Sequence, residues 1–244
     1  MQFPGSNCDV DCMDALKRHF EISAIPVWHQ DGKLPKLDGV VIPGGFSFGD
    51  YLRSGALAAH APIMQDVKQF ADQGGAVLGI CNGFQVLLQT GLLLPDWDTG
   101  QRSVTLAQNA SGRFVDCWVH LQAKPGNCVF LQGLDHFELP VAHAEGRFTT
   151  SDEASLQKLE AGGQFVLHYA QTGDGQQTNP NGSIRNIAGM CDTTGRIFGL
   201  MPHPERFIEA TQHPAWSGRL DPQADGAGLT FFRNALRVIG KDVG

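Results

Sequence analysis

The chain has 244 residues and a formal net charge of −7, from 18 Lys and Arg against 25 Asp and Glu. This length allows one large α/β domain or two small ones. The negative net charge argues against nucleic acid or an anionic membrane as a main partner. The longest apolar runs are far shorter than the ~20 residues that span a bilayer. The N-terminus lacks the basic and apolar regions of a signal peptide, so a cytoplasmic protein is expected.

The cysteines are scattered and include no C-x-x-C pair; they are Cys8, Cys12, Cys81, Cys117, Cys128 and Cys191. Neither a disulfide framework nor a zinc site is therefore expected. Most of these thiols are expected to be small buried apolar side chains. The sequence around Cys81 sets that residue apart.

The first half of the chain alternates helical patterns with short apolar runs. The periodicity predicts helices over residues 9–20, 58–73 and 83–94. Buried strands are predicted over residues 24–28, 39–42 and 76–80. The first helix has Asp9 or Asn7 as its expected cap, and its apolar face is expected to consist of Val10, Met13, Leu16 and Phe20. This alternation predicts a parallel sheet with crossover helices.

The second half is richer in strand patterns. They predict strands over residues 113–122, 164–170, 186–191 and 196–200, and a closing helix over residues 229–239. Loops rich in Gly or Pro are expected over residues 173–183 and 212–228. No internal repeat and no long linker divides the chain. Residues 1–244 are therefore predicted to form a single α/β domain.

The strongest chemical signal is the sequence G-I-C-N-G at residues 79–83. It is the cysteine counterpart of the G-x-S-x-G nucleophile elbow, in which a strand turns sharply into a helix and exposes the central residue. The helix N-terminus favours a thiolate at Cys81, and the N–H of Asn82 would face a developing oxyanion. Taken alone, the pattern fits a buried cysteine in a tight turn equally well.

A thiol nucleophile needs a base, and the base needs a group that orients it. His203 and Glu205 offer both, directly after the apolar run at residues 197–201. Side chains two apart leave the same side of an extended segment, and the flanking prolines favour that conformation. A lone His-Pro pair at a strand end is more often a surface turn. The competing base is His143, which has Glu145 at the same spacing.

A glycine-rich segment follows the predicted strand at residues 39–42. Gly44 and Gly45 end that strand, and their backbone N–H groups could stabilise a tetrahedral intermediate. The alternatives are a phosphate-binding loop or a plain turn. The chain contains no G-x-x-x-x-G-K-[ST] run and no G-x-G-x-x-G that opens a helix, so nucleotide binding by these motifs is unsupported.

Together these segments resemble the class I (triad) glutamine amidotransferases, and within them the glutaminase subunits of phosphoribosylformylglycinamidine synthase. The similarity spans most of the chain, with weaker matches at residues 225–226 and 231–232. It is carried by blocks at residues 3–9, 44–55, 79–85, 111–114, 143–148, 179–183 and 201–206. It implies a flavodoxin-like fold, with a mostly parallel central sheet flanked by helices and an antiparallel section in the second half.

The resemblance also implies roles for individual residues. The nucleophile, the general base and acid, and the orienting carboxylate would be Cys81, His203 and Glu205. The N–H groups of the oxyanion hole would come from Gly45 and Asn82. Gln85, in the C-x-G-x-Q motif, would help to hold the substrate L-glutamine.

Members of this family split glutamine into glutamate and ammonia, which passes through a tunnel to a synthetase subunit. That partner uses ATP and magnesium to convert formylglycinamide ribonucleotide to the amidine, a step of purine synthesis. A small third subunit bridges the two in the multi-subunit form. The resemblance therefore implies no cofactor or metal on this chain, and ATP and magnesium on its partner.

The chain departs from the family pattern in two places. Residues 1–3 can supply at most the end of an opening strand, so either that strand is short or the start has been placed too late. Residues 95–108 match none of the family blocks, so no contacts can be carried over there.

Two rival functions are considered. One is a stand-alone cysteine hydrolase of the γ-glutamyl hydrolase or DJ-1-like kind, but neither explains the block at residues 44–55, and DJ-1-like proteins lack the His-Pro-Glu segment. The other is a catalytically silent regulatory subunit. Such a subunit would not need Cys81, His203 and Glu205 all intact.

Overall fold

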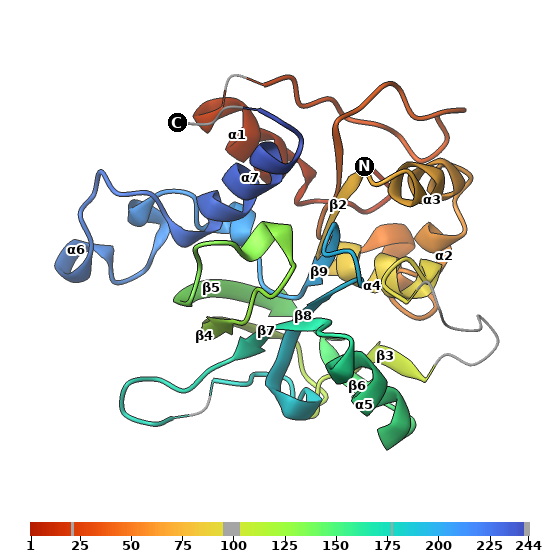
Figure 1. The fold of residues 1–244 in the computed structure, drawn as a ribbon. Helices are drawn as coiled ribbons and strands as arrows, with labels where there is room; N and C mark the ends of the chain where they lie inside the picture. The colour runs from red at the N-terminus through yellow and green to blue at the C-terminus, as the bar shows by residue number, and fades with distance from the viewer. Residues whose placement is uncertain (21, 95–102, 177, 242–244) are drawn as a thin grey trace.

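A computed structural model describes residues 1–20, 22–94, 103–176 and 178–241. Its main sheet has seven strands in the order β1-β2-β9-β8-β7-β4-β5 (Figure 1). Their bounds, in chain order, are β1 Gly39–Ile42, β2 Ala76–Ile80, β4 Val115–Ala123, β5 His136–His143, β7 Phe165–Tyr169, β8 Ile187–Cys191 and β9 Ile197–Leu200. A second sheet pairs β3 (Val104–Ala107) with β6 (Arg147–Thr150).

The parallel section of the main sheet consists of β1, β2 and β9. The pairing of β1 with β2 and the pairing of β2 with β9 are both parallel, and Ile80 at the end of β2 lies opposite Leu200 at the end of β9. The carboxyl ends of these two strands therefore reach the same edge of the sheet. The residues that follow them, Cys81 and the segment that carries His203, leave from that edge.

The antiparallel section comes from the second half of the chain. The pairings β9–β8, β8–β7, β7–β4 and β4–β5 are all antiparallel. The expected combination of a parallel section with an antiparallel addition in the second half is confirmed. Because β5 ends the strand order, one of its sides remains free to meet the loops that follow the parallel strands.

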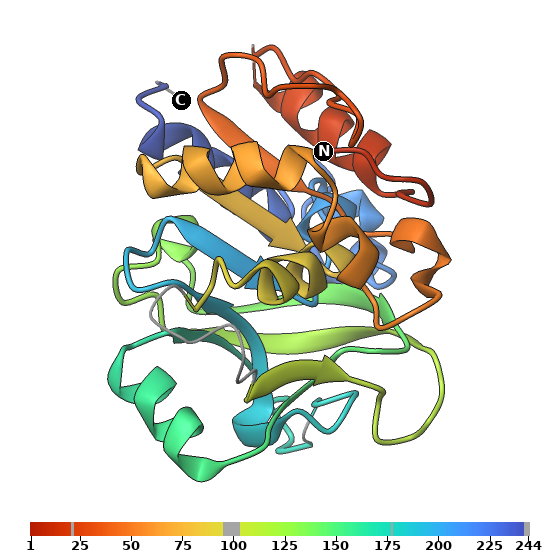
Figure 2. The same ribbon diagram turned by 90° about the vertical axis from the view of Figure 1, so that its right-hand side faces the viewer.

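Helices cover both faces of the parallel section (Figures 1 and 2). On one side lie α1 (Asp9–His19) and α7 (Ala227–Val238), and on the other lie α2 (Ala56–Ala59), α3 (Ile63–Asp72) and α4 (Asn82–Thr90). The two remaining helices are α5 (Glu153–Ala161) and α6 (Trp216–Arg219). Short 3₁₀ turns lie at η1 Ser47–Asp50, η2 Val129–Leu131, η3 Ile184–Asn186, η4 Pro204–Arg206 and η5 Ala210–Gln212.

One cluster of buried apolar side chains extends from Phe3 to Leu236 and so draws on both halves of the chain. Phe84 of α4 is fully buried in it and packs closely against Gly199 of β9. This contact joins the helix that follows Cys81 to the strand that leads to His203. Within the described residues, no helix is both long and apolar enough to cross a bilayer.

The predicted strand over residues 24–28 is wrong. Trp28 forms only an isolated parallel bridge with Gln2, and Ile25 and Trp28 are 46% and 39% exposed. The N-terminal amino group donates to the Val41 carbonyl of β1 at 2.7 Å. The opening segment thus contributes one bridge instead of a full strand, and a cavity of about 430 Å³ lies between it, β1, α1 and α7.

Other boundaries differ for local reasons. The helix predicted over residues 58–73 is two helices, because the chain turns before Pro62 and α3 begins after it. The helix predicted over residues 83–94 ends at Thr90, because Gly91 takes a left-handed conformation with φ of 78°. The expected cap of the first helix, Asp9 or Asn7, is wrong, because the N-cap residue is Cys8 and it makes no side-chain capping hydrogen bond. Val10, which was expected on the apolar face of this helix, is exposed.

Five of the helices and strands were not predicted from the sequence, namely β3, β5, β6, α5 and α6, the last of which lies in the loop expected over residues 212–228. Strand β5 contains an internal proline, Pro140, which is rare inside a strand because proline cannot donate to a ladder. It is tolerated since β5 lies at the edge of the sheet. The start of α5 did carry a signal, as Asp152 caps the helix by accepting from the Ser155 N–H at 2.7 Å.

Replacing Phe84 by alanine should lower the free energy of unfolding by about 3–5 kcal/mol, because it removes a fully buried ring and leaves a cavity. Phe114→Ala is the matched control. Its side chain is 51% exposed, and the change should stay within about 0.5 kcal/mol. Urea unfolding followed by circular dichroism measures both. Equal losses in the two variants would contradict the position of Phe84 in the core.

Candidate active site

Cys81 lies in the sharp turn between β2 and α4. Its backbone has φ of 50° and ψ of −103°, which is sparsely populated for a residue with a side chain. Such a conformation costs of order 1–3 kcal/mol and persists only where the surroundings enforce it. Those surroundings require glycine, because a Cβ on Gly83 would lie 2.0 Å from the Ile42 carbonyl oxygen and one on Gly79 would lie 2.7 Å from that of Gly83. The strand–turn–helix elbow is therefore present as predicted.

The Cys81 thiol faces β5 and is 5% exposed. Its Sγ donates to the carbonyl oxygen of Ala142 at 3.7 Å. Cys81 also precedes the first residue of α4, where the unpaired N–H groups and the helix dipole favour negative charge. The sulfur therefore has an acceptor for its proton and donors that would stabilise its anion.

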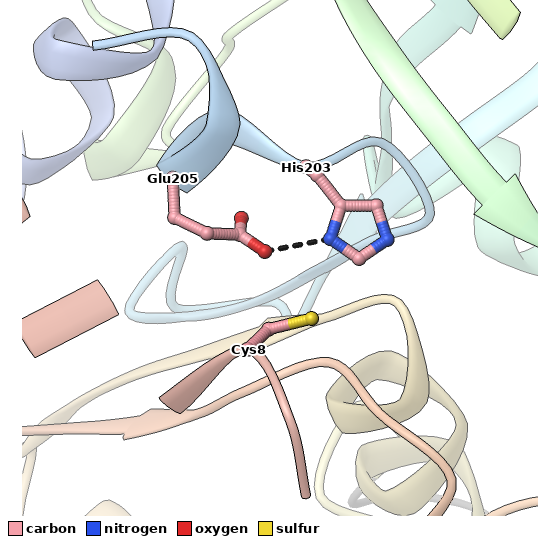
Figure 3. Close-up of side chains that lie close together, drawn as sticks. All are labelled: Cys8, His203 and Glu205. Carbon is pink, nitrogen blue, oxygen red and sulfur yellow. Dashed lines mark hydrogen bonds and ion pairs between the residues drawn. The ribbon is translucent and has the colours of Figure 1, made fainter. Parts of the chain in front are cut away.

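His203 and Glu205 form a buried pair just beyond β9. The ring Nδ1 lies 2.6 Å from Oε1 of Glu205, and both side chains are almost fully inaccessible (Figure 3). The backbone N–H of His203 donates to the Pro140 carbonyl of β5 at 2.9 Å. Pairing of the two side chains is confirmed. The local conformation differs from the expected extended segment, because Glu205 lies in the 3₁₀ turn η4, with its carboxylate beside Nδ1 of the ring.

Burial disfavours the charged form of His203, but the Glu205 carboxylate and Cys81 outweigh it and raise the pKa of the imidazole well above its ordinary value. Since the thiol donates to Ala142, Nε2 of His203 makes no hydrogen bond within the described residues. The structure therefore pairs His203 with Glu205, attaches both the Cys81 thiol and the His203 backbone to carbonyls of β5, and leaves Nε2 of His203 without a hydrogen-bond partner among the described residues.

Cys8, which sequence reasoning left among the inert thiols, lies next to this pair (Figure 3). Possible ligand atoms of Cys8, His203 and Glu205 lie within 4.8 Å of one another, as in a metal site. However, Arg206 donates to the Cys8 sulfur at 3.1 Å. A guanidinium in that position supplies the positive charge that a metal ion would bring. The ion pair of His203 with Glu205 and the hydrogen bond from Arg206 to Cys8 thus join these side chains to one another.

His143, the alternative base, is held away from Glu145. Its Nδ1 lies 3.1 Å from Oδ1 of Asn109, whereas the Glu145 carboxylate accepts from the Ser54 hydroxyl at 2.9 Å. Burial, and to a lesser extent the charge on His203, lowers the pKa of His143 to about 4. The ring is therefore neutral near pH 7, and geometry favours His203 as the base that has a carboxylate partner.

Gly45 and Asn82, the expected donors of an oxyanion hole, belong to the segments that follow β1 and β2. Gly45 has φ of 143° and pairs with Ser6 in an isolated antiparallel bridge. Asn82 is the first residue of α4, so its backbone N–H has no partner within the helix. Its side chain accepts from the Ser47 N–H at 3.1 Å and thereby joins α4 to the glycine-rich segment.

Gln85 lies one turn along α4 and is buried. Its amide oxygen accepts from the Asn82 side chain at 2.8 Å, and its amide nitrogen donates to the Glu145 backbone carbonyl at 2.5 Å. Both ends of the Gln85 amide are therefore engaged inside the protein. The side chain fixes the spacing between α4 and the segment after β5, and its expected contact with glutamine stays a prediction.

Several residues of this network were missed by sequence reasoning, namely Cys8, Asp50, Ser54 and Glu145 as the partner of Ser54. The Asn82 amide also donates to Asp50 at 3.3 Å. Burial, followed by the charge of Glu145, raises the pKa of the Asp50 carboxyl. The signal that could have found these residues was present, since each lies in one of the blocks at residues 3–9, 44–55 and 143–148.

The depressed pKa of His143 predicts a pH-dependent stability. The unfolded chain binds a proton at this residue below about pH 6.5, whereas the folded chain binds it only near pH 4. Stability should therefore fall as pH drops through this window, by up to about 1.4 kcal/mol per pH unit from this group. In urea unfolding at about pH 7 and about pH 5, His143→Gln should show a shallower decline. Parallel declines in both proteins would contradict the assignment.

Comparisons with known proteins place the chain in a family. A model of the CobB/CobQ-like glutamine amidotransferase domain matches residues 1–238. The phosphoribosylformylglycinamidine synthase subunit PurQ of Trichormus variabilis is 46% identical over 97% of this chain and 95% of its own. That of Salinibacter ruber is 46% identical over 85% of this chain and 86% of its own.

Among solved structures, a chain of PurLQS from Thermotoga maritima superimposes with a TM-score of 0.75 and 34% identity. The match covers 97% of this chain and 95% of the other. Sequence and structure thus agree along almost the whole length of the chain. The chain belongs to the family of CobB/CobQ-like glutamine amidotransferase domains.

Proposed function

We propose that this chain is the glutaminase subunit of a phosphoribosylformylglycinamidine synthase, which hydrolyses L-glutamine to glutamate and ammonia for de novo purine synthesis. The observation that carries the proposal is the strained Cys81 at the end of β2 together with the buried His203 after β9, whose Nδ1 lies 2.6 Å from Oε1 of Glu205. This is the arrangement that a thiol nucleophile requires, with a base and an orienting group. The relatives named PurQ support the choice of pathway.

The first half of the reaction is acyl transfer to sulfur. Cys81 attacks the side-chain carbonyl carbon of glutamine as a thiolate, after its proton has passed to Nε2 of His203, because the raised pKa of His203 favours the imidazolium. The carbonyl oxygen gains negative charge and accepts hydrogen bonds from the backbone N–H groups of Gly45 and Asn82. Protonated His203 then gives its proton to the leaving nitrogen. Ammonia leaves, and a γ-glutamyl thioester remains on Cys81.

The second half is hydrolysis of the thioester. Neutral His203 takes a proton from water, and the resulting hydroxide adds to the thioester carbonyl, which again places an oxyanion at the same two N–H groups. Collapse of the intermediate releases glutamate and returns the proton to sulfur. Glu205 stabilises the imidazolium in both halves, which agrees with the raised pKa of His203. One glutamine and one water thus yield one glutamate and one ammonia.

The rest of the proposal concerns the partners. We place ATP and magnesium on a synthetase subunit that receives the ammonia, with a small third subunit bridging the two and no cofactor on this chain. The PurLQS assembly of the structural neighbour supports such a complex.

We place the enzyme in the cytoplasm, where its six free cysteines would stay reduced. We also propose that residues 1–244 act as one amidotransferase domain, because the buried cluster joins both halves.

The two rival functions predict different activities for the isolated chain. A stand-alone cysteine hydrolase would reach full activity without any partner, whereas the proposed subunit should hydrolyse glutamine weakly alone and faster with the synthetase and its nucleotide. A silent regulatory subunit would have no need for a strained nucleophile with a buried, charge-paired base. The geometry of the elbow favours an active enzyme over the silent subunit.

A glutamine-analogue electrophile should label Cys81 alone among the six thiols, because the analogue is held where the activated sulfur attacks. Intact-mass measurement and peptide mapping give the stoichiometry and the site. Cys117→Ser is the matched control, since Cys117 is the exposed thiol, and it should leave labelling unchanged. Labelling that persists in Cys81→Ser would falsify the nucleophile assignment.

Replacing Glu205 by glutamine should lower kcat for glutamate release by about 10²–10⁴-fold with little change in KM, because the imidazolium loses its charge partner. The pKa of His203 should fall, so the alkaline limb of the kcat/KM profile should move to lower pH. Glu153→Gln, at an exposed position of α5, is the control and should behave as wild type. An unchanged pH profile in Glu205→Gln would contradict the role of the pair.

A further inference from the structure

Glu205 uses only one of its two carboxylate oxygens to bond with other described residues. Oε1 lies 2.6 Å from Nδ1 of His203, whereas Oε2 is buried and makes no hydrogen bond within the described part of the chain. A buried carboxylate oxygen normally has a donor, because an unpaired polar atom costs free energy. The next residue is Arg206, which could supply one. A structural cause is therefore needed for the missing pairing of these two neighbours.

Arg206 is held by Cys8 instead. Its guanidinium donates to the Cys8 sulfur at 3.1 Å, and its backbone N–H donates to the His203 carbonyl at 3.2 Å. Burial disfavours the charged guanidinium, but Cys8 and then Glu205 outweigh burial and raise the pKa of Arg206. Arg206 therefore stays positive beside the carboxylate while its hydrogen bond goes to sulfur.

Cys8 is fixed in position at the start of α1. It is the N-cap residue and is buried. Its backbone N–H donates to the Gly44 carbonyl at 3.3 Å, and its thiol donates to the Asn7 side chain at 3.2 Å. The proton of the thiol is thus directed at Asn7, which leaves a lone pair of the sulfur for Arg206. A Cβ on Gly44 would lie 3.1 Å from this sulfur, so the sulfur has little room to move.

The Cys8 sulfur also lies beside the catalytic pair (Figure 3). One side-chain atom each of Cys8, His203 and Glu205 lie within 4.8 Å of one another. The guanidinium that meets the sulfur is therefore next to the carboxylate. If Arg206 turned to Oε2 of Glu205, it would share the negative charge that now acts on His203.

We propose that Cys8 is a positioning residue for the glutaminase reaction, whose thiol holds the Arg206 guanidinium away from Glu205 and so keeps that carboxylate for His203. This inference rests on the proposed function. In the proposed mechanism Glu205 stabilises the imidazolium in both halves of the reaction. A cation that paired with Glu205 would therefore oppose each proton transfer to His203.

Other titratable groups surround the catalytic pair. They are Cys81 in the elbow, His143 in β5, Cys8, Asp11 and Cys12 at the start of α1, and Arg206 in η4. Burial lowers the pKa of His143 to about 4 and raises that of Cys12, so both stay uncharged near neutral pH. Arg206 thus carries the positive charge that a change at Cys8 can move.

The test measures the pKa of His203 directly. Proton–nitrogen correlation spectra of the imidazole rings follow its titration, and the signal is assigned by its loss in His203→Gln. In Cys8→Ala the guanidinium is free to turn to Glu205. The pKa of His203 should then fall by about one unit or more, since a nearby charge shifts a pKa by about 1–3 units. An unchanged pKa would overturn the inference.

Cys8→Ser retains an acceptor with a shorter reach, so it should show a smaller fall than Cys8→Ala. If Cys8→Ala does not fold, Cys8→Ser carries the same test. Removing both partners, in Cys8→Ala with Arg206→Gln, should return the pKa of His203 to the wild-type value or above it. A fall that persists in this double variant would contradict the part assigned to Arg206.

Cys12→Ala is the matched control. Cys12 is also buried, one turn further along α1, where its N–H donates to the Cys8 carbonyl at 3.1 Å. Its removal should loosen the helix to a similar extent but leave the pKa of His203 unchanged. An equal fall in Cys12→Ala and Cys8→Ala would mean that the helix alone is responsible, and the inference would be wrong.

Glutaminase kinetics connect the pKa to the reaction. The alkaline limb of kcat/KM for glutamate release should move to lower pH in Cys8→Ala and return in the double variant, with folding checked by circular dichroism. A lowered pKa of His203 with an unmoved alkaline limb would overturn the role of Cys8 in the reaction. If the wild-type chain hydrolyses no glutamine but the pKa shifts as expected, the proposed function is wrong and the position of Arg206 stands.

Discussion

The site depends on the parallel pairing of β2 with β9. Because Ile80 lies opposite Leu200, the two strands end together, and the chain beyond each of them can supply one partner of a thiol–imidazole pair. The elbow directs the Cys81 thiol toward β5, while η4 places the Glu205 carboxylate beside Nδ1 of His203. A shift of either strand by one residue would flip its side chains to the other face and separate the pair. The register between β2 and β9 therefore determines how the segments that carry Cys81 and His203 lie relative to each other.

A second constraint is the balance of buried charge. The Glu205 carboxylate is removed from water, and such a group is tolerated only when it is paired and hydrogen-bonded. His203 pairs with this carboxylate directly, and Arg206 donates a hydrogen bond to the sulfur of the neighbouring Cys8. Burial of Asp11, reinforced by the charge of Glu205, raises the pKa of the Asp11 carboxyl. These contacts stabilise the imidazolium form of His203 and leave its Nε2 without a hydrogen-bond partner among the described residues.

The sequence was most informative where a local pattern has one physical explanation. The G-x-C-x-G elbow and the parallel strands beside it could be predicted, because small residues and short apolar runs are required wherever a strand turns directly into a helix. The His203–Glu205 pair could be predicted as a pairing but not in its geometry. Neither the edge strand β5, which carries an internal proline, nor the link from Ser54 to Glu145 could be predicted, since each depends on contacts between distant segments.

Strand β5 has a consequence for how the site can vary. Its carbonyls at Pro140 and Ala142 are two residues apart, so they point in the same direction, toward the free edge. One receives the backbone N–H of His203 and the other the thiol of Cys81. A single edge strand therefore sets the spacing between Cys81 and His203, the proposed nucleophile and base. Substitutions in β4 or β5 that change the position of β5 would therefore change the spacing of Cys81 and His203, while the parallel section stays intact.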